Sequence, residues 1–120
     1  MRSETAAANA TAVAVRNGTT VINDVTVEQR APAAPVLYLQ VFNTNAPTVG
    51  TTLPRFVIEV PAGNVTLDNN PLRCDYDGPL GGAYMATGLA YAVTTTQTGN
   101  TNPTAGQEPR VVLNYNQIGA

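Results

Sequence analysis

The sequence predicts an all-β protein, a single antiparallel β-sandwich or jelly-roll-like domain. Short runs alternate apolar and polar residues with a period of two, and Gly, Pro and Asn punctuate them. No window keeps the apolar spacing of an amphipathic helix for more than two turns. Short strands and turn signals at such regular spacing are typical of sandwiches and jelly rolls. The 120 residues suit one domain.

The chain begins with an Ala-rich stretch, "MRSETAAANA", that shows no strand or helix pattern. Ten residues are too few for a stable isolated helix. We therefore predict an N-terminal arm at residues 1–10, outside a β-sandwich domain at residues 11–120. Our hypothesis is that this arm becomes ordered on a neighbouring subunit.

The next stretch, "TAVAVRNGTTVINDVTV", predicts a strand over residues 11–16 and a second strand from Thr19 onwards. Asn17-Gly18 lies between them. Asn-Gly between extended runs is a strong hairpin signal, because both central residues of a type I′ turn need positive φ. The stretch therefore predicts a hairpin, followed by a proline-broken spacer, "RAPAAP".

Two further runs predict core strands on either side of an unusual loop. The inward-facing residues are expected to be Leu37, Leu39 and Val41 of "VLYLQVF" and Phe56, Ile58 and Val60 of "RFVIEV". The connecting loop has about a dozen residues and no charge before Arg55, whereas hairpin loops usually take about two to five residues. Such a loop suits an active-site wall, a binding surface or an assembly contact.

The second half of the chain continues the strand pattern. "PAGN" leads into "VTLD", where Val65 and Leu67 are expected to face inward. "NNPLRCDYDGPLGG" is irregular, and "GLAYAVTTT" reads as a strand. A polar loop, "QTGNTNPTAGQEP", then precedes a final strand, "RVVLNYN".

Composition excludes several function classes. Charged residues make up 12% of the chain, against about 25% in typical proteins. The net charge is −2 and lysine is absent, which argues against a nucleic-acid partner. No apolar run reaches the ~20 residues of a membrane span, and the start lacks a signal-peptide pattern. So weakly charged a surface favours one that neighbours partly cover.

The residue inventory closes most catalytic routes. The chain has no histidine to act as a general base and no lysine for a Schiff base. Its only serine, Ser3, lies in the predicted arm. Cys74 is the only cysteine, so it has neither a disulfide partner within the chain nor a histidine to activate it. We predict a protein that is not an enzyme, with no catalytic residue, cofactor or metal.

Asp75 and Asp77 in "CDYDG" form the one close carboxylate pair that could still carry chemistry. Two residues apart on an extended segment, they point the same way and could share a proton or a cation. A calcium loop would need a third acid, a later glycine and an acid in place of Ala86. Turn capping by the two aspartates is the preferred interpretation. A glycosidase is disfavoured because aromatic residues are only 6% and tryptophan is absent.

Other polar and aromatic features receive structural interpretations. Tyr38, Tyr91 and Tyr115 lie within strand patterns and are expected in the core or at its rim. Tyr76 and Tyr84, in the irregular segment, are the better interface candidates. Asn9, Asn17 and Asn64 match the glycosylation sequon, which we attribute to chance in an Asn- and Thr-rich chain.

The block "VLYLQVFNTNAPTVGTTLPRFVIEVPAG", with the later "TGLAYAVTTT" and "VVLNYN", resembles small β-sandwich virion structural proteins of tailed bacteriophages. The likeness covers about residues 36–116. The matching positions are Leu39, Val41, Phe42, Asn43, 46–50, Pro54, Phe56–Val60, 61–63, Gly88, Leu89, Tyr91, Ala92, Thr94 and 111–115.

This resemblance implies a virion component assembled in the host cytoplasm. It points to a capsid decoration (cement) protein that contacts the major capsid protein or other virion structural proteins. A baseplate, tail-fibre or head-fibre adaptor or adhesin module is the alternative. Such decoration proteins are commonly homo-oligomers, with a trimer favoured.

Two departures from the group's pattern affect the interpretation. Relatives often carry Asp-x-Asp in the late loop, where this chain has "TGNTNPTAG", so no cation site is carried over to this loop. The irregular segment "NNPLRCDYDGPLGGAYMATG" is also longer than usual for the group, which suggests a partner contact of its own.

Overall fold

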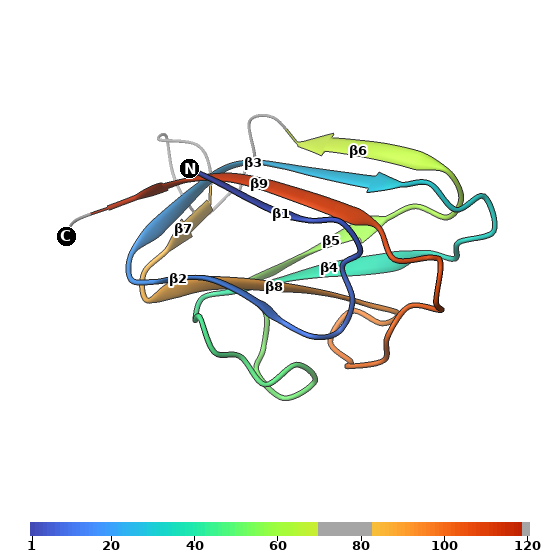
Figure 1. Ribbon diagram of the computed structural model, residues 1–120. Coiled ribbons are helices and arrows are strands. Elements are labelled where there is room, and N and C mark those ends of the chain that lie inside the picture. The colour runs from blue at the N-terminus through green and yellow to red at the C-terminus, as the bar shows by residue number, and fades with distance from the viewer. Residues whose placement is uncertain (70–82, 119–120) are drawn as a thin grey trace.

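The computed structural model describes residues 1–69 and 83–118, which form nine strands in two antiparallel sheets and no helix (Figure 1). The predicted all-β class and sandwich architecture are confirmed. The first sheet has the order β1-β9-β3-β6, with β7 also paired to β3, and the second has the order β2-β8-β4-β5. The first sheet comprises β1 (Arg2–Thr5), β3 (Thr20–Gln29), β6 (Val65–Asn69), β7 (Ala83–Met85) and β9 (Arg110–Gln117). The second comprises β2 (Val13–Asn17), β4 (Leu37–Phe42), β5 (Phe56–Val60) and β8 (Gly88–Thr94).

The core lies between the two sheets and follows the period of two in the sequence. Leu37, Leu39 and Val41 of β4 are fully buried and pack with the inward residues of β3, β8 and β9. Phe56 and Ile58 of β5 are half-buried and pack against the same core, as predicted. The inward residues of β6 are Val65 and Leu67, which also agrees with the sequence.

The Asn17-Gly18 hairpin prediction is wrong. β2 pairs with β8 in the second sheet, and β3 pairs with β6, β7 and β9 in the first, so the turn carries the chain from one sheet to the other. Gly18 has φ of 130°, but no other residue type has positive φ in the described parts of the chain, so Asn17 does not adopt a type I′ conformation. Gly18 N–H instead donates to the Thr87 carbonyl, 3.0 Å away.

Residues 1–10 also differ from the expectation of an arm outside the core. Arg2–Thr5 form β1, an edge strand that pairs with β9 in the register Arg2↔Asn114. Ser3 and Thr5 face inward, where the Thr5 hydroxyl lies 2.5 Å from the Tyr91 hydroxyl across the sandwich. Ala8 is buried in the core, and its N–H donates to the Pro109 carbonyl. This segment is therefore part of its own domain's sandwich.

Several residues singled out in the sequence lie outside the described part of the chain. They are Cys74, Asp75, Tyr76 and Asp77. The carboxylate pair and one of the two tyrosine interface candidates therefore stay predictions from the sequence.

Candidate interaction surface

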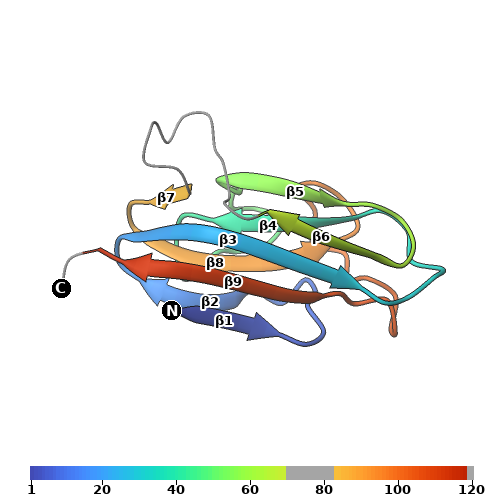
Figure 2. The ribbon, with the colours of Figure 1, turned by 90° about the horizontal axis from the view of Figure 1, so that it is seen from above.

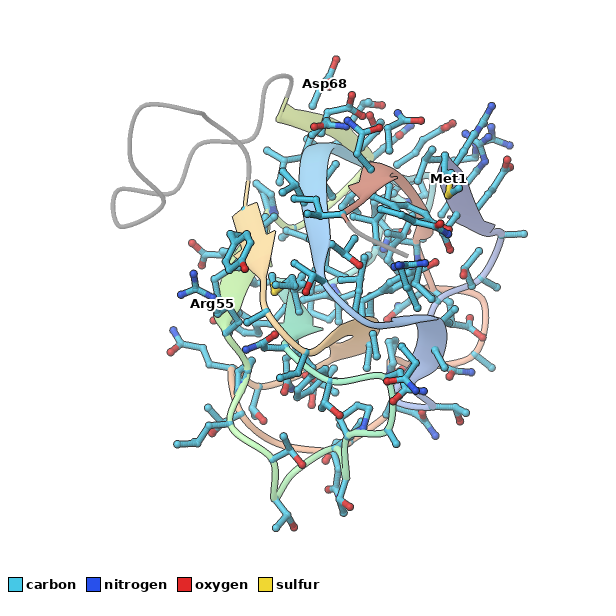
Figure 3. All side chains as sticks on the ribbon, turned by 90° about the vertical axis from the view of Figure 1, so that its left-hand side faces the viewer. Met1, Arg55 and Asp68 are labelled. Atoms are coloured by element: carbon cyan, nitrogen blue, oxygen red, sulfur yellow. The ribbon has the colours of Figure 1, made fainter. Side chains whose placement is uncertain are left out.

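Two long loops flank the second sheet. The first loop and the start of the second lie on the side that faces away from the first sheet, whereas the end of the second loop returns to the first sheet, where the Gln107 carbonyl accepts from Gln29 Nε2 at 2.7 Å. Residues 43–55 connect β4 to β5, and residues 95–109 connect β8 to β9. Figures 1 and 3 show both loops beneath β4 and β8, so that they form a partial third layer. In the second loop, Thr95 N–H donates to the Thr101 carbonyl at 3.2 Å, which closes the part that meets the sheet. We call residues 43–54 and 95–101 the neutral loop layer.

A small apolar cluster fixes the first loop to the sheet. Phe42, Ala90 and Ala92 lie on the outer face of β4 and β8, yet all three are buried. Val49, near the tip of the first loop, packs against them. Both faces of β4 and β8 are therefore buried, which explains why "GLAYAV" reads as a nearly continuous apolar run rather than an alternating one.

Hydrogen bonds within the first loop hold it in one conformation. Thr48 N–H donates to Thr52 Oγ1 at 2.9 Å, and Thr52 N–H donates back to the Thr48 carbonyl at 2.8 Å. At the end of the loop, Arg55 N–H donates to the Val41 carbonyl at 2.7 Å. At its start, the Asn43 side chain accepts from Thr87 N–H at 3.0 Å. The loop is thus braced at both ends and across its tip.

Gly88, the first residue of β8, allows the first loop to approach the sheet closely. A Cβ atom at this position would lie 2.8 Å from the Asn45 nitrogen and 3.0 Å from the Arg16 carbonyl oxygen. Both neighbours are backbone atoms, which cannot move aside as a flexible side chain could. Glycine is therefore required here by contact rather than by φ.

The second loop is tied to the sheet by Gln40, which points outward from β4 and is fully buried. Its amide nitrogen donates to Thr94 Oγ1 at 2.6 Å and to the Gly99 carbonyl at 3.0 Å. Its Oε1 atom has no hydrogen-bond partner among the described residues, so the amide nitrogen alone makes this tether. The two loops also meet, because a Cβ on Gly50 would lie 3.0 Å from the Asn100 Cβ.

The neutral loop layer carries no formal charge. None of the six basic and eight acidic residues of the chain falls within residues 43–54 or 95–101. Its surface consists mainly of Thr, Asn, Gln, Ala and Gly, with one large apolar side chain, Leu53, that is 80% exposed. Such a surface can contribute hydroxyl and amide hydrogen bonds and an apolar anchor, but no titratable or metal-binding group.

The opposite face is the outer side of the first sheet, and Figure 2 shows none of the described segments crossing it. This face carries charged side chains. Arg110 on β9 contacts Glu4 on β1 at 2.6 Å and Glu28 on β3 at 3.5 Å. Arg30 contacts Glu28 at 2.5 Å. Asp68 points away from the sandwich in Figure 3 and accepts a 3.4 Å hydrogen bond from Thr26.

These contacts lower the pKa of the glutamates. The hydrogen bond from Arg110 holds the pKa of Glu4 below its ordinary value, and the hydrogen bond from Arg30 does the same for Glu28. A hollow of about 240 Å³ opens beside them, lined by Glu28, Arg30, Glu108 and Arg110 among other residues. Its acidic and basic groups are balanced, so it does not select a ligand of either charge.

The remaining sequence-predicted site residues occupy ordinary places. Tyr91 and Tyr115 are buried and Tyr38 is half-buried, as predicted for core or rim. Tyr84 on β7 is 46% exposed, and its carbonyl accepts from Arg55 Nε at 3.2 Å. No group of three or more His, Cys, Asp or Glu residues that could hold a metal occurs in the described residues.

The sequence interpretation missed Leu53. Its only signal was an isolated large apolar residue in a Thr- and Pro-rich loop, and periodicity cannot rank such a residue because a loop has no regular faces.

Residues 1–69 and 83–118 contain no helix long and apolar enough to cross a membrane.

Comparisons with protein-family models, curated proteins and solved structures found no match to this chain. The relation to phage virion proteins therefore stays a prediction from the sequence, and the function must be argued from the molecule's own surfaces.

Proposed function

We propose that this chain is a non-enzymatic structural protein of a tailed-bacteriophage virion, a capsid decoration protein that stabilises the head shell through contacts with the major capsid protein. The observation that carries the proposal is the neutral loop layer, a braced and uncharged surface with one exposed leucine. The centres of protein–protein interfaces are depleted of charged residues. The sequence resemblance to virion proteins supplies the partner.

The chemistry of the described residues fits a structural role. The chain has no histidine or lysine, and its only serine, Ser3, accepts or donates a hydrogen bond to Tyr91 inside the sandwich. Five charged residues form ion pairs with one another on or beside the first sheet: Arg2, Glu4, Glu28, Arg30 and Arg110. Their arrangement stabilises contacts between strands and requires no substrate.

Binding to a repeating shell relaxes the demand on each contact. When a homo-oligomer binds several equivalent sites at once, each further contact forms at a high effective concentration, so modest affinity for one site suffices. We therefore also propose that the chain is a homo-oligomer, with a trimer favoured. Light scattering of the purified protein measures this directly.

Quantitative mass spectrometry of purified virions tests the proposal. The major capsid protein and a tail protein in the same digest serve as internal standards. A copy number comparable with that of the major capsid protein supports decoration. A copy number comparable with that of the tail protein would instead favour a position in the tail or baseplate. Absence from virions would overturn a structural role altogether.

A further inference from the structure

We infer that the neutral loop layer is the face that docks on the capsid shell, with Leu53 inserted into an apolar pocket of the major capsid protein, while the first sheet faces solvent. This inference rests on the proposed function and adds the orientation, the anchor residue and the chemistry of the partner's surface.

The first argument is the segregation of charge. Residues 43–54 and 95–101 contain no charged residue, and on this side of the molecule Arg16, Arg55 and Glu59 belong to or flank the edge strands β2 and β5. Glu4, Asp24, Glu28 and Arg110, in contrast, gather on the outer face of the first sheet. Burying a charge without a partner is costly, while burying a hydroxyl or amide requires only a hydrogen bond. The loop layer can therefore be covered at lower cost, and a charged outward face keeps the decorated particle soluble.

The second argument is that the first sheet's charges already have partners. Glu4, Arg110, Glu28 and Arg30 form a continuous chain of contacts, and Asn114 donates to Asp24 at 2.6 Å. A shell bound to this face would have to remove water from paired charges without offering better partners, and that desolvation cost can exceed the gain. The same charges cost nothing when they face solvent.

The third argument is that Leu53 is exposed on rigid backbone. Just before it, Thr52 N–H donates to the Thr48 carbonyl, and just after Pro54, Arg55 N–H donates to the Val41 carbonyl. The leucine side chain is 80% exposed although its flanking backbone is fixed. An anchor held in this way loses little conformational entropy on binding, so more of its burial contributes to affinity.

The partner surface follows from these features. A side chain the size of leucine needs an apolar pocket, and a surround of threonine and asparagine needs uncharged donors and acceptors. The partner is therefore an uncharged region of the shell protein with a small apolar pocket. Because no charge lies in the loop layer, binding is expected to depend weakly on salt.

The test uses virions from which this chain is genetically removed, together with purified full-length protein added back. Wild type is compared with Leu53→Asp and with Ile118→Asp. Ile118 is 45% exposed and directly follows β9 of the first sheet, so the second variant introduces the same charge outside the neutral loop layer. Circular dichroism and thermal unfolding confirm that both variants fold.

We expect Leu53→Asp to bind at least about tenfold more weakly than wild type, because docking would bury an unpaired carboxylate. Ile118→Asp should bind like wild type. Wild-type affinity should change by less than about twofold between about 0.05 and 0.5 M NaCl.

The outcomes separate the inference from the proposed function. If wild type binds and Leu53→Asp binds equally well, or if salt abolishes binding, the docking face is wrong while decoration stands. If Leu53→Asp changes the oligomeric state in solution, Leu53 contacts a second copy of the chain and the inference is overturned. If wild type does not bind the shell at all, both proposals are wrong.

Discussion

The two sheets of this sandwich treat their outer faces in opposite ways. Within residues 1–69 and 83–118, the outer face of the first sheet is uncovered and carries paired charges, whereas the neutral loop layer covers the outer face of the central strands β4 and β8 of the second sheet. Both sheets share the same core, so packing between them does not require this difference. The second sheet thus has an additional layer on its outer face, which two long loops form.

The largest expected effect comes from Phe42, which distinguishes a packed third layer from loops that merely rest on the sheet. Phe42 lies on the outer face of β4 and is fully buried against Ala90, Ala92 and Val49. Phe42→Ala should lower the free energy of unfolding by about 3–5 kcal/mol, as for a core aromatic. Denaturant unfolding measures this.

Tyr84→Ala is the matched control for Phe42, because Tyr84 is an exposed aromatic on β7 of the first sheet. It should cost less than about 1 kcal/mol. Equal costs for the two variants would mean that the loops contribute no real burial and would remove the contrast between the sheets.

A smaller effect is expected at Gly88, where the loop and the second sheet approach most closely. Gly88→Ala would place a Cβ 2.8 Å from the Asn45 nitrogen, so the loop must shift. We expect a loss of about 1–3 kcal/mol, the usual range for overpacking. Hydrogen exchange should speed up at the Thr48 and Thr52 amides, while β3 and β9 amides keep their relative protection. Unchanged exchange in the loop would show that it is not held by the sheet.

The smallest effect is expected on the first sheet, from its ion pairs. Because the pKa values of Glu4 and Glu28 are lowered below 4.5 in the folded protein, the unfolded chain binds more protons as the pH falls. Their stabilisation is present above pH 4.5 and is lost as the pH drops through the folded-state pKa values. Exposed pairs of this kind contribute little.

Glu4→Gln tests the ion pairs directly, because it removes the Arg110 contact while keeping the side chain's size. Its Tm should be slightly below that of wild type at pH 7, and the gap should close as the pH falls through the lowered folded-state pKa of Glu4, because wild-type Glu4 then becomes neutral as well. A gap that persists in acid would show that Glu4 acts through packing and not through charge.

Much of the fold could be predicted because the sequences of β4, β5, β8 and β9 are rich in apolar residues and bounded by turn residues. Leu37, Leu39 and Val41 alternate with more polar residues, and the period of two assigns their face. β1 could not be found in this way, because its inward residues, Ser3 and Thr5, are polar and meet the Tyr91 hydroxyl. No hydrophobic pattern marks such a strand.

Asn17-Gly18 failed as a hairpin signal for a different reason. The dipeptide indicates where the chain turns, but it does not decide which strand the following strand, β3, pairs with. Long-range contacts decide this, and β3 pairs with β9 rather than with β2. Two features of the sequence are consistent with the covered outer face of the second sheet: Phe42 on that face of β4, and the continuous apolar run of β8. The exposure of Leu53, which we propose as an anchor, was not indicated by any comparable pattern.

The pairing of β1 with β9, in the register Arg2↔Asn114, affects the order in which the two sheets can form during synthesis. β4 and β5 pair with each other and are close in the sequence, so both leave the ribosome within a short time and can pair early. β1 leaves the ribosome first but has no strand to join until β9 is synthesised. The first sheet is therefore completed last, and β1 stays unpaired while the chain between it and β9 is synthesised.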